Sequence, residues 1–204
     1  MKTLGVFSQK GGSGKTLISC HLSVAAQQSG KKTVLIDCDE QGSATSWSTS
    51  RDGDTPTVVT ANPSNITQVL KAASDDGYDL AILDCPPHAV AGILTFINAA
   101  DLTIVPCQPS AFDLAAAGRA VSLLSANRRP FAFVISRAPY NAPEIKDAVA
   151  ALETHGPVAP TIISDRRSYG RALISGQSVT EYEKDGKAAD EVRALWKWIE
   201  KEMK

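Results

Sequence analysis

The stretch Gln9-Lys10-Gly11-Gly12-Ser13-Gly14-Lys15-Thr16, which follows a short apolar run at 4–7, decides the fold of this chain. It matches the phosphate-binding pattern G-x-x-x-x-G-K-[ST] except at the first position, where Gln9 replaces glycine. Small residues let successive backbone N–H groups turn toward an anion, and the helix that follows adds its positive end. An ordinary glycine turn needs no Gly-Lys-Thr ending, so the stretch predicts a site for nucleotide phosphates.

Individual residues of this loop have distinct expected roles. Lys15 can reach the terminal phosphates of a nucleotide, and the Thr16 hydroxyl can hold a magnesium ion. Leu17 excludes the dinucleotide pattern G-x-G-x-x-G, because it stands where the third glycine is required. The predicted nucleotide-binding residues of the loop are Lys10, Gly11, Gly12, Ser13, Gly14, Lys15, Thr16 and Leu17.

Length and composition indicate one soluble globular domain that covers residues 1–204. With 43% hydrophobic and 21% charged residues, the chain can bury a substantial core. The net charge of −1 gives no overall attraction to DNA or membranes, so any nucleic-acid binding must come from a local patch. No apolar run reaches the length of a membrane span, and the N-terminus resembles a strand rather than a signal peptide. A cytoplasmic location is therefore expected.

Apolar runs bounded by turn residues alternate with helical stretches along the chain. This alternation predicts an α/β fold, a doubly wound and mostly parallel twisted sheet with helices on both faces. The expected strands lie near 3–8, 33–37, 57–61, 79–84, 102–106, 131–136 and 158–163, and the expected helices near 15–29, 64–75, 111–126, 143–154 and 187–203. The polar segment 43–54 is expected to be the least ordered part.

Cysteines and histidines are not expected to bind metals. The four cysteines, Cys20, Cys38, Cys85 and Cys107, lack C-x-x-C spacing and are predicted to be buried thiols in a reducing compartment. His21, His88 and His155 match no metal-ligand spacing, so each is interpreted as a packing or surface residue.

Acidic residues close two of the predicted strands. Asp37 and Asp39 follow the run 34–36, and Asp84 follows the run 80–83. Ligands of open parallel sheets bind at the carboxyl ends of the strands, and carboxylate oxygens are ligands that magnesium prefers. Any one aspartate alone is better explained as a helix cap or turn residue. Three of them after a phosphate loop predict a magnesium site, with Asp84 as the principal carboxylate.

The extra lysine of the loop, Lys10, carries a resemblance to a known family. The form Lys-Gly-Gly-x-Gly-Lys-Thr is similar to the deviant phosphate loop of the ParA/MinD ATPases. The resemblance implies that Lys10 reaches across a dimer interface to the nucleotide of the partner subunit. It also implies that Asp39 orients the attacking water and that Asp37 supports the magnesium site. The alternative for Lys10 is a solvated surface lysine.

These implications complete the predicted site. The predicted catalytic residues are Lys10, Lys15 and Asp39, and the predicted metal site consists of Thr16, Asp37 and Asp84. One departure from the family pattern is Glu40, which replaces the proline that commonly follows the second aspartate. An additional carboxylate there can alter the magnesium site or the rate of hydrolysis.

The resemblance extends downstream. The stretch 134–137, which ends at Arg137, looks like the strand end that helps to form the adenine pocket. The stretch 162–182 resembles the C-terminal region of plasmid partition ATPases, and an early first strand without a helix-turn-helix extension resembles the short, small-plasmid ParA proteins.

Two groups of basic residues are candidates for DNA contact. Arg166, Arg167 and Arg171 form a local cluster, and in partition ATPases this region contributes to non-specific DNA binding. Arg193, Lys197 and Lys201 share one face of the last helix, at i, i+4 and i+8, and are the second candidates. The alternative for both groups is a solvated or salt-bridged surface.

The resemblance therefore implies a ParA-type ATPase for plasmid or chromosome partition, with ATP and Mg²⁺ as cofactors and weak intrinsic turnover. The ATP form is expected to be a homodimer that binds DNA non-specifically and is nucleoid-associated. A ParB-like centromere-binding partner is expected to stimulate hydrolysis and release the dimer from DNA.

Two other functions are considered. One is a membrane-associated positioning ATPase like MinD, whose last helix is a basic amphipathic anchor. Here the charges of the last helix nearly cancel, so no stable membrane anchor is expected. The other is a metabolic phosphotransferase of the same fold, which Lys10 disfavours.

Overall fold

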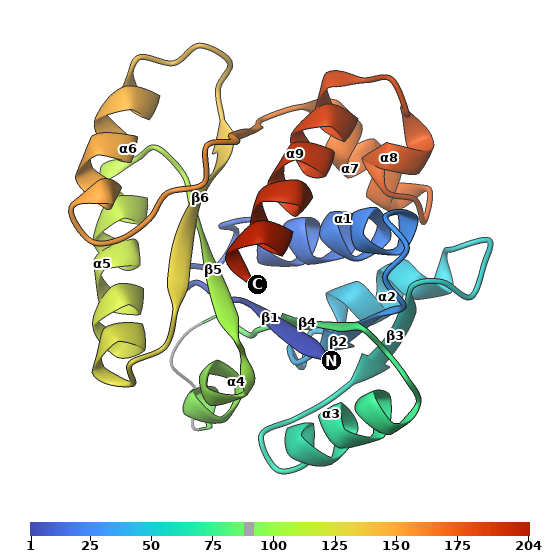
Figure 1. Ribbon diagram of the computed structural model, residues 1–204. Coiled ribbons are helices and arrows are strands. Elements are labelled where there is room, and N and C mark those ends of the chain that lie inside the picture. The colour runs from blue at the N-terminus through green and yellow to red at the C-terminus, as the bar shows by residue number, and fades with distance from the viewer. Residues whose placement is uncertain (88–91) are drawn as a thin grey trace.

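A single parallel sheet of seven strands organises the computed structural model, which describes residues 1–87 and 92–204 (Figure 1). His88 lies outside the described residues. The strands are β1 (Lys2–Val6), β2 (Thr33–Asp37), β3 (Thr57–Thr60), β4 (Leu80–Asp84), β5 (Leu102–Cys107), β6 (Phe131–Ala138) and β7 (Ile163–Ser164). Their order in the sheet is β3-β2-β4-β1-β5-β6-β7, and every neighbouring pair is parallel.

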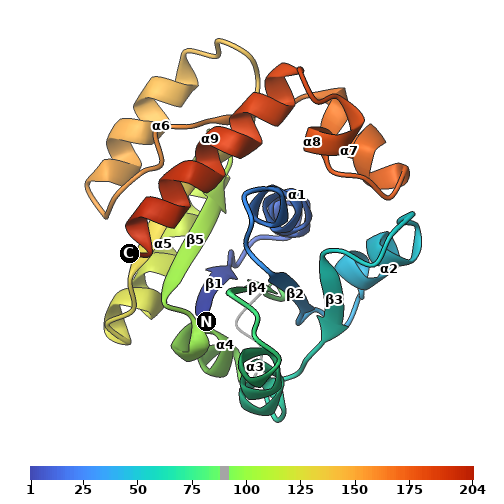
Figure 2. The same ribbon diagram turned by 45° about the vertical axis from the view of Figure 1, so that its right-hand side comes forward.

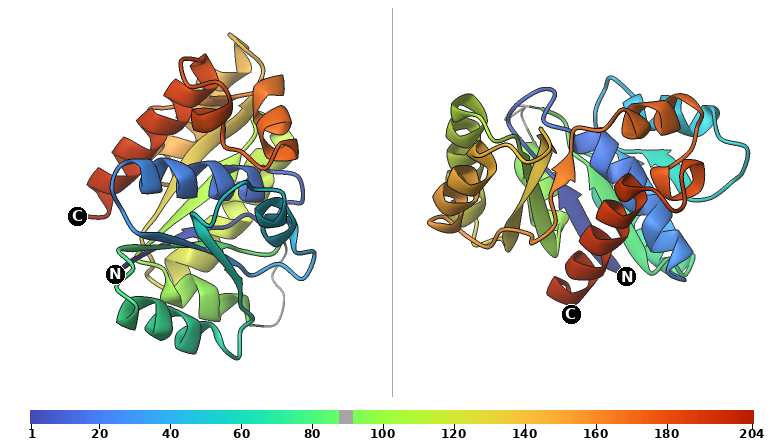
Figure 3. Two further views of the ribbon diagram at one scale, coloured as in Figure 1. Left: turned by 90° about the vertical axis from the view of Figure 1, so that its right-hand side faces the viewer. Right: turned by 90° about the horizontal axis from the view of Figure 1, so that it is seen from above.

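Helices cover both faces of this sheet (Figure 2). One face carries α1 (Lys15–Gln28), α2 (Ser43–Thr49), α7 (Arg167–Ile174), α8 (Val179–Tyr182) and α9 (Lys187–Glu202). The other face carries α3 (Ile66–Asp75), α4 (Ile93–Ala99), α5 (Ala111–Ala126) and α6 (Glu144–Glu153). Helix α9 packs against α1, and both views of Figure 3 show the two helices on the same face.

Strand β4 illustrates why these sequences form central strands. All five of its residues are buried, as expected for a strand covered on both sides. Leu80 and Ile82 belong to the core on the α1 face, whereas Ala81 and Leu83 belong to the core on the opposite face. The predicted doubly wound architecture is confirmed.

The central strand β1 sets the position of the functional site. It pairs with β4 on one side and with β5 on the other. The chain leaves β1 for β2 on one side and reaches β5 and β6 on the other, so the strand order reverses at β1. A crevice forms at such a switch point, outside the carboxyl ends of the strands. The loop that joins β1 to α1 is the predicted phosphate loop.

Most of the predicted elements are observed, but three expectations are wrong. The segment 43–54 was expected to be the least ordered part, yet it forms α2 and buries Trp47. The last strand is reduced to Ile163–Ser164, and Val158 makes only an isolated bridge to Phe133. The short helices α4, α7 and α8 were not predicted.

Two further expectations concern burial and hydrophobicity. The four cysteines are free and buried, as predicted. Within the ranges 1–87 and 92–204, the helices are too short or too polar to cross a bilayer.

Candidate nucleotide site

The phosphate loop adopts a conformation that depends on its glycines. Gly12 has a φ of 74° and Gly14 a φ of 97°, a left-handed region that other residues rarely adopt. Gly14 is also the N-cap of α1, and among residues 1–87 and 92–204 no side chain caps this helix end. The first N–H groups of α1 are therefore free of side-chain acceptors, as a phosphate site at a helix N-terminus requires.

The ends of β5 and β6 hold this loop in place. Ser136 Oγ donates to Ser13 O at 2.8 Å. Gln108 Nε2 and Arg137 Nη1 both donate to Gly12 O, at 3.0 Å and 3.1 Å. Arg137 was predicted at the adenine pocket, and the structure places it at the mouth of the same crevice, where it binds the loop. Its contact with a nucleotide stays a prediction.

A cavity of about 440 Å³ opens beside the loop. It is lined by the loop residues Gly11, Gly12, Gly14, Lys15, Thr16 and Leu17, by Asp39, Pro87 and Arg137, and by the stretch 163–167 together with Tyr169 and Gly170. The contribution of 163–170 to this cavity was not predicted. The stretch carries no nucleotide-binding pattern, and it reaches the cavity only because β7 lies beside β6.

Asp84 ends β4 at the bottom of the crevice and has the character of a metal ligand. Its side chain is buried, and Ser19 Oγ donates to its Oδ1 at 3.1 Å. Its other oxygen, Oδ2, has no hydrogen-bond partner within the described part of the chain. Burial raises the pKa of Asp84 to about 7, although the neighbouring Thr16 and Ser19 hydroxyls act to lower it. A buried carboxylate oxygen without a partner, close to the Thr16 hydroxyl, fits a magnesium ion.

Asp37 lies beside Asp84 in the strand register, but both of its oxygens are engaged. Oδ2 accepts hydrogen bonds from the N–H and the hydroxyl of Thr45, at 2.8 Å and 2.9 Å. Oδ1 accepts from the Asp39 N–H at 3.2 Å. Asp37 therefore fixes the loop 38–45 and the start of α2. Its support of the magnesium site stays a prediction.

Lys15 and Asp39 both line the cavity beside the phosphate loop. Lys15 is buried, and its Nζ donates to Lys10 O at 3.3 Å. Burial lowers the pKa of Lys15, whereas the charges of Asp84 and Asp39 raise it. Asp39 lines the cavity and remains partly exposed to solvent. The cavity thus brings together Lys15, a cation that can bind phosphate, and Asp39, a carboxylate that can orient a water molecule.

Lys10 is not a free surface lysine. Its Nζ lies 2.5 Å from Oδ2 of Asp113, which is buried near the start of α5 and also accepts a hydrogen bond from the Ser110 hydroxyl. Sequence reasoning missed Asp113. The pattern Ser110-x-x-Asp113 is typical of a helix start, but nothing in it identifies a partner 103 residues earlier in the chain.

The three arginines of the predicted basic cluster, at the start of α7 and within it, differ in their exposure and in their ion pairs. Arg167 and Arg171 are exposed. Arg166 forms an ion pair with Glu191 at 2.8 Å, and this carboxylate raises its pKa. Arg166 and Arg167 also line the nucleotide cavity. Two of the three arginines are therefore available for DNA.

The second basic group lies on the exposed face of α9. Lys197 and Lys201 are exposed, and Arg193 is exposed but lies 3.3 Å from Asp190. DNA contact by either group stays a prediction.

Comparison with known proteins agrees with this geometry. Residues 4–179 match the family model described as the CobQ/CobB/MinD/ParA nucleotide binding domain. The chain belongs to this family. The family resemblance drawn from Lys10 and the phosphate loop is confirmed, and the matched residues include this loop.

Individual relatives show how far the similarity extends. Maintenance of carboxysome distribution protein A from Halothiobacillus neapolitanus is 30% identical over 95% of this chain and 94% of that protein. The chromosome-partitioning ATPase Soj from Thermus thermophilus is 30% identical over 56% of this chain and 57% of that protein. The septum site-determining protein MinD complexed with Mg-ADP, from Pyrococcus horikoshii, has a TM-score of 0.79 at 17% identity, over 97% of this chain and 95% of that chain.

Proposed function

We propose that this protein is a ParA-type positioning ATPase that hydrolyses ATP slowly alone and switches between a monomer and a DNA-binding dimer. The observation that carries the proposal is Lys10, a second lysine at the rim of the phosphate loop. Its side chain is 37% exposed and is held away from the loop's own cavity by Asp113. A lysine at this position can bind a nucleotide that is held by a second copy of the chain.

The chemistry follows from the residues around the cavity. The loop N–H groups and Lys15 would hold the phosphates, while Thr16 and Asp84 would hold magnesium. When bound, magnesium would neutralise charge on the phosphate oxygens. Asp39 accepts a hydrogen bond from the attacking water and orients it. Lys10 leaves Asp113 and binds the nucleotide of the partner subunit.

Slow hydrolysis by the single chain is part of this proposal. Lys10 is engaged by Asp113, so each monomer lacks the second cation of the complete site. Stabilising charge on the transferred phosphoryl group is a large part of catalysis in phosphate-loop enzymes. Dimerisation and a partner protein would complete the site and set the time at which ATP is hydrolysed.

The cargo defines two candidate roles for the same switch. One role is plasmid or chromosome partition, for which we expect a ParB-like partner; the match to the chromosome-partitioning ATPase Soj supports a role in partition. Distribution of a protein assembly is favoured by the match to the carboxysome distribution protein, which extends over 95% of this chain against 56% for Soj. The two roles share ATP-dependent DNA binding and differ in the partner that triggers hydrolysis.

A membrane-bound role is less well supported, because the apolar face of α9 is already occupied. Val192, Leu195 and Trp196 are buried in the core on the α1 face. Trp196 Nε1 also donates to Ser29 Oγ at 2.8 Å. A helix in this position has no free apolar face for lipid. We therefore expect a cytoplasmic protein that associates with the nucleoid in its ATP form.

The test is size-exclusion chromatography with ADP, ATP and a non-hydrolysable ATP analogue, each with and without plasmid DNA. A dimer that elutes with DNA only in ATP or the analogue supports the proposal. Co-sedimentation with anionic vesicles, and not with DNA, would instead favour the membrane role. A monomer in all three nucleotides would refute both.

A further inference from the structure

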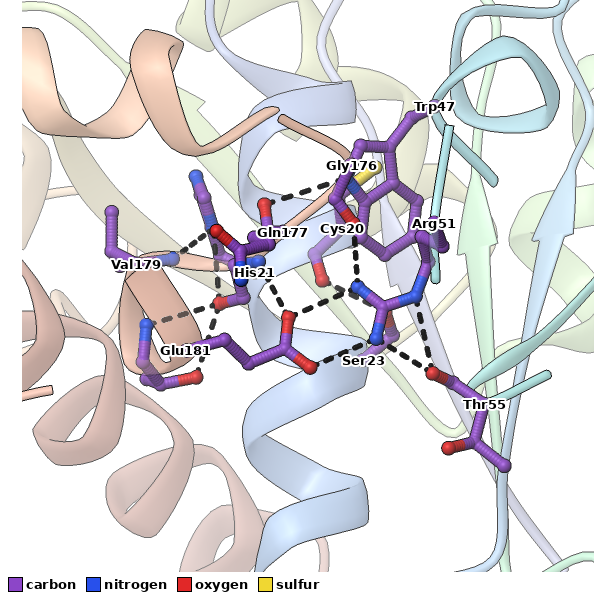
Figure 4. A network of polar contacts seen from close by, with 12 residues as sticks. Cys20, His21, Ser23, Trp47, Arg51, Thr55, Gly176, Gln177, Val179 and Glu181 are labelled. Atoms are coloured by element: carbon purple, nitrogen blue, oxygen red, sulfur yellow. Dashed lines mark hydrogen bonds and ion pairs between the residues drawn. The ribbon is translucent and has the colours of Figure 1, made fainter. Parts of the chain in front are cut away.

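A partly buried polar network joins the end of α2 to the turn between α7 and α8 (Figure 4). Its centre is Arg51, which follows α2 and whose side chain is 9% exposed. Nη1 of Arg51 donates to Oε2 of Glu181 at 3.0 Å, and Nη2 donates to Oε1 at 2.9 Å. This is the parallel, two-bond pairing that a guanidinium makes with a carboxylate and that a lysine cannot reproduce.

The remaining donors of Arg51 bind backbone carbonyls. Nη1 also donates to Gly176 O at 2.9 Å, and Nε and Nη2 donate to Thr55 O at 3.1 Å and 2.7 Å. The guanidinium lies over the ring of Trp47 at 4.8 Å, and Trp47 Nε1 donates to Gln177 O at 3.4 Å. Side chains of α2 and of the residues after it thus bind two carbonyls of the α7–α8 turn, those of Gly176 and Gln177.

The two segments also meet without a gap between their backbones. Gly176 has a φ of +68°, and a Cβ atom placed there would lie 2.0 Å from Ser50 O. A displacement of α2 therefore cannot be absorbed by loose packing at this contact. The turn and the end of α2 must move together, or the contact must open.

The opposite end of α2 is tied to the nucleotide site. Asp37 accepts two hydrogen bonds from Thr45 in the first turn of this helix. The loop between them carries Asp39, which lines the nucleotide cavity. A γ-phosphate bound by Lys15 would lie near this loop, because Lys15 and Asp39 line the same cavity and the charges of Asp39 and Asp84 both act on Lys15. Helix α2 therefore connects that loop to the α7–α8 turn as a rigid element.

A second support of the turn comes from the phosphate-loop helix. His21 of α1 accepts a hydrogen bond from the Val179 N–H at 3.2 Å, and its Nδ1 lies 3.1 Å from Ser178 Oγ. The turn thus rests on α1, which begins at the phosphates, and on α2, which follows the Asp39 loop. A change in the distance between these two helices is transmitted to the turn, and through it to α7.

We propose that Arg51 is a positioning residue that couples the Asp39 loop to α7, so that the terminal phosphate of the nucleotide sets the position of Arg167 and Arg171. The DNA consequence rests on the proposed function, whereas the coupling between the loop and α7 does not. An ion pair that served only to stabilise the fold would have the same effect on α7 in the ADP state and in the ATP state. The test must therefore compare nucleotide states.

The direct test is hydrogen exchange of the full chain in ADP and in a non-hydrolysable ATP analogue. In the parent protein, amides of 167–176 should exchange at different rates in the two states. In Arg51→Ala this difference should vanish, while amides of 10–17 remain protected by nucleotide. A difference that persists in Arg51→Ala, or is absent in the parent, would overturn the proposal. Glu181→Gln is the second variant if Arg51→Ala does not fold, and it should reduce the difference in the same direction.

DNA retention tests the functional consequence. Arg51→Ala should lose ATP-dependent affinity for DNA by about fivefold or more, the range of ordinary allosteric coupling, while ATP-dependent dimerisation is retained. Lys71→Ala, which removes an exposed ion pair with Asp75 on α3, is the control and should bind DNA like the parent. If the parent fails to bind DNA, the proposed function falls, and the exchange difference alone decides the role of Arg51. Parent-like DNA binding by Arg51→Ala would contradict its role in positioning α7.

Discussion

Lys10 and Asp113 are joined within one chain, although their positions in the sequence differ by 103 residues. The pair connects the rim of the phosphate loop to the start of α5. Asp113 is almost completely buried, whereas the Lys10 side chain keeps 37% of its surface exposed. The family resemblance assigns Lys10 to the nucleotide of a partner subunit. In the monomer, the carboxylate of Asp113 in the same chain restrains this lysine.

Removing the charge of Asp113 should release this lysine. We expect Asp113→Asn to increase the ATP-dependent dimerisation constant by about tenfold, because a charge-assisted hydrogen bond no longer competes with the partner's phosphates. Sedimentation velocity in ATP measures the change. The matched control is Asp147→Asn, an exposed aspartate in the first turn of α6. Weaker dimerisation of Asp113→Asn would show that the pair supports the dimer instead of restraining it.

Variants of Lys15 and Asp39 should differ in which property they lose, nucleotide binding or ATP hydrolysis. Lys15→Ala should lose nucleotide binding or turnover, because Lys15 lies inside the phosphate cradle. Asp39→Ala should still bind ATP and dimerise, yet hydrolyse ATP about a hundredfold more slowly, because it lacks the carboxylate that orients the attacking water. Single-turnover hydrolysis and nucleotide titration measure the two properties. An Asp39→Ala protein that loses ATP affinity as severely as Lys15→Ala would contradict the role of Asp39.

The arginines of α7 should contribute unequally to DNA binding. Each phosphate neutralised adds roughly one unit to the slope of log affinity against log salt, so Arg171→Ala in a two-fold dimer should flatten the slope by about two. Arg166→Ala should flatten it less, because Arg166 is paired with Glu191. DNA retention over a salt series in ATP provides the slopes. Equal slopes for the parent and Arg171→Ala would remove α7 from the interface.

His21 should make stability depend on pH. Burial lowers its pKa to about 3, from an ordinary value near 6.5. The unfolded chain therefore binds more protons than the folded chain between these values, and the free energy of unfolding should fall as pH decreases from about 6.5 toward 3. Through His21, the free energy of unfolding should fall by at most about 1.4 kcal/mol for each pH unit.

Denaturant unfolding at several pH values isolates the effect of His21. His21→Asn keeps an acceptor for the Val179 N–H but cannot be protonated in this range, so its stability should fall less steeply with acid. His155→Asn, at an exposed position, is the control. Identical pH slopes for the parent and His21→Asn would mean that His21 does not contribute.

The sequence predicted the parts of the molecule that depend on local patterns. The phosphate loop, the central strands and the strand-end aspartates each carry a recognisable pattern, and the structure brings Lys15, Asp39 and Asp84 to one crevice. Helix α2 was missed because its sequence, Ser-Ala-Thr-Ser-Trp-Ser-Thr, is rich in hydroxyl residues and has little apolar periodicity. It is held by Asp37 at one end and by Trp47 and Arg51 at the other, and these contacts are tertiary.

Long-range pairs account for the remaining differences. Lys10 follows β1 and Asp113 follows β5, and these two strands are neighbours only in the folded sheet. Arg166 was predicted to contact DNA, with a salt-bridged arginine as the alternative, and in the folded chain it pairs with Glu191 of α9. Neither partner can be identified from spacing along the sequence, because the parallel sheet brings together residues that are far apart in the chain.

The most direct test of the central claim is sedimentation velocity of the parent and Lys10→Ala, in ADP and in a non-hydrolysable ATP analogue. The account predicts that both proteins bind ADP with similar affinity as monomers. The parent should become a dimer in the analogue, and Lys10→Ala should remain a monomer. A Lys10→Ala protein that dimerises like the parent would contradict the claim that Lys10 completes the site of a second subunit.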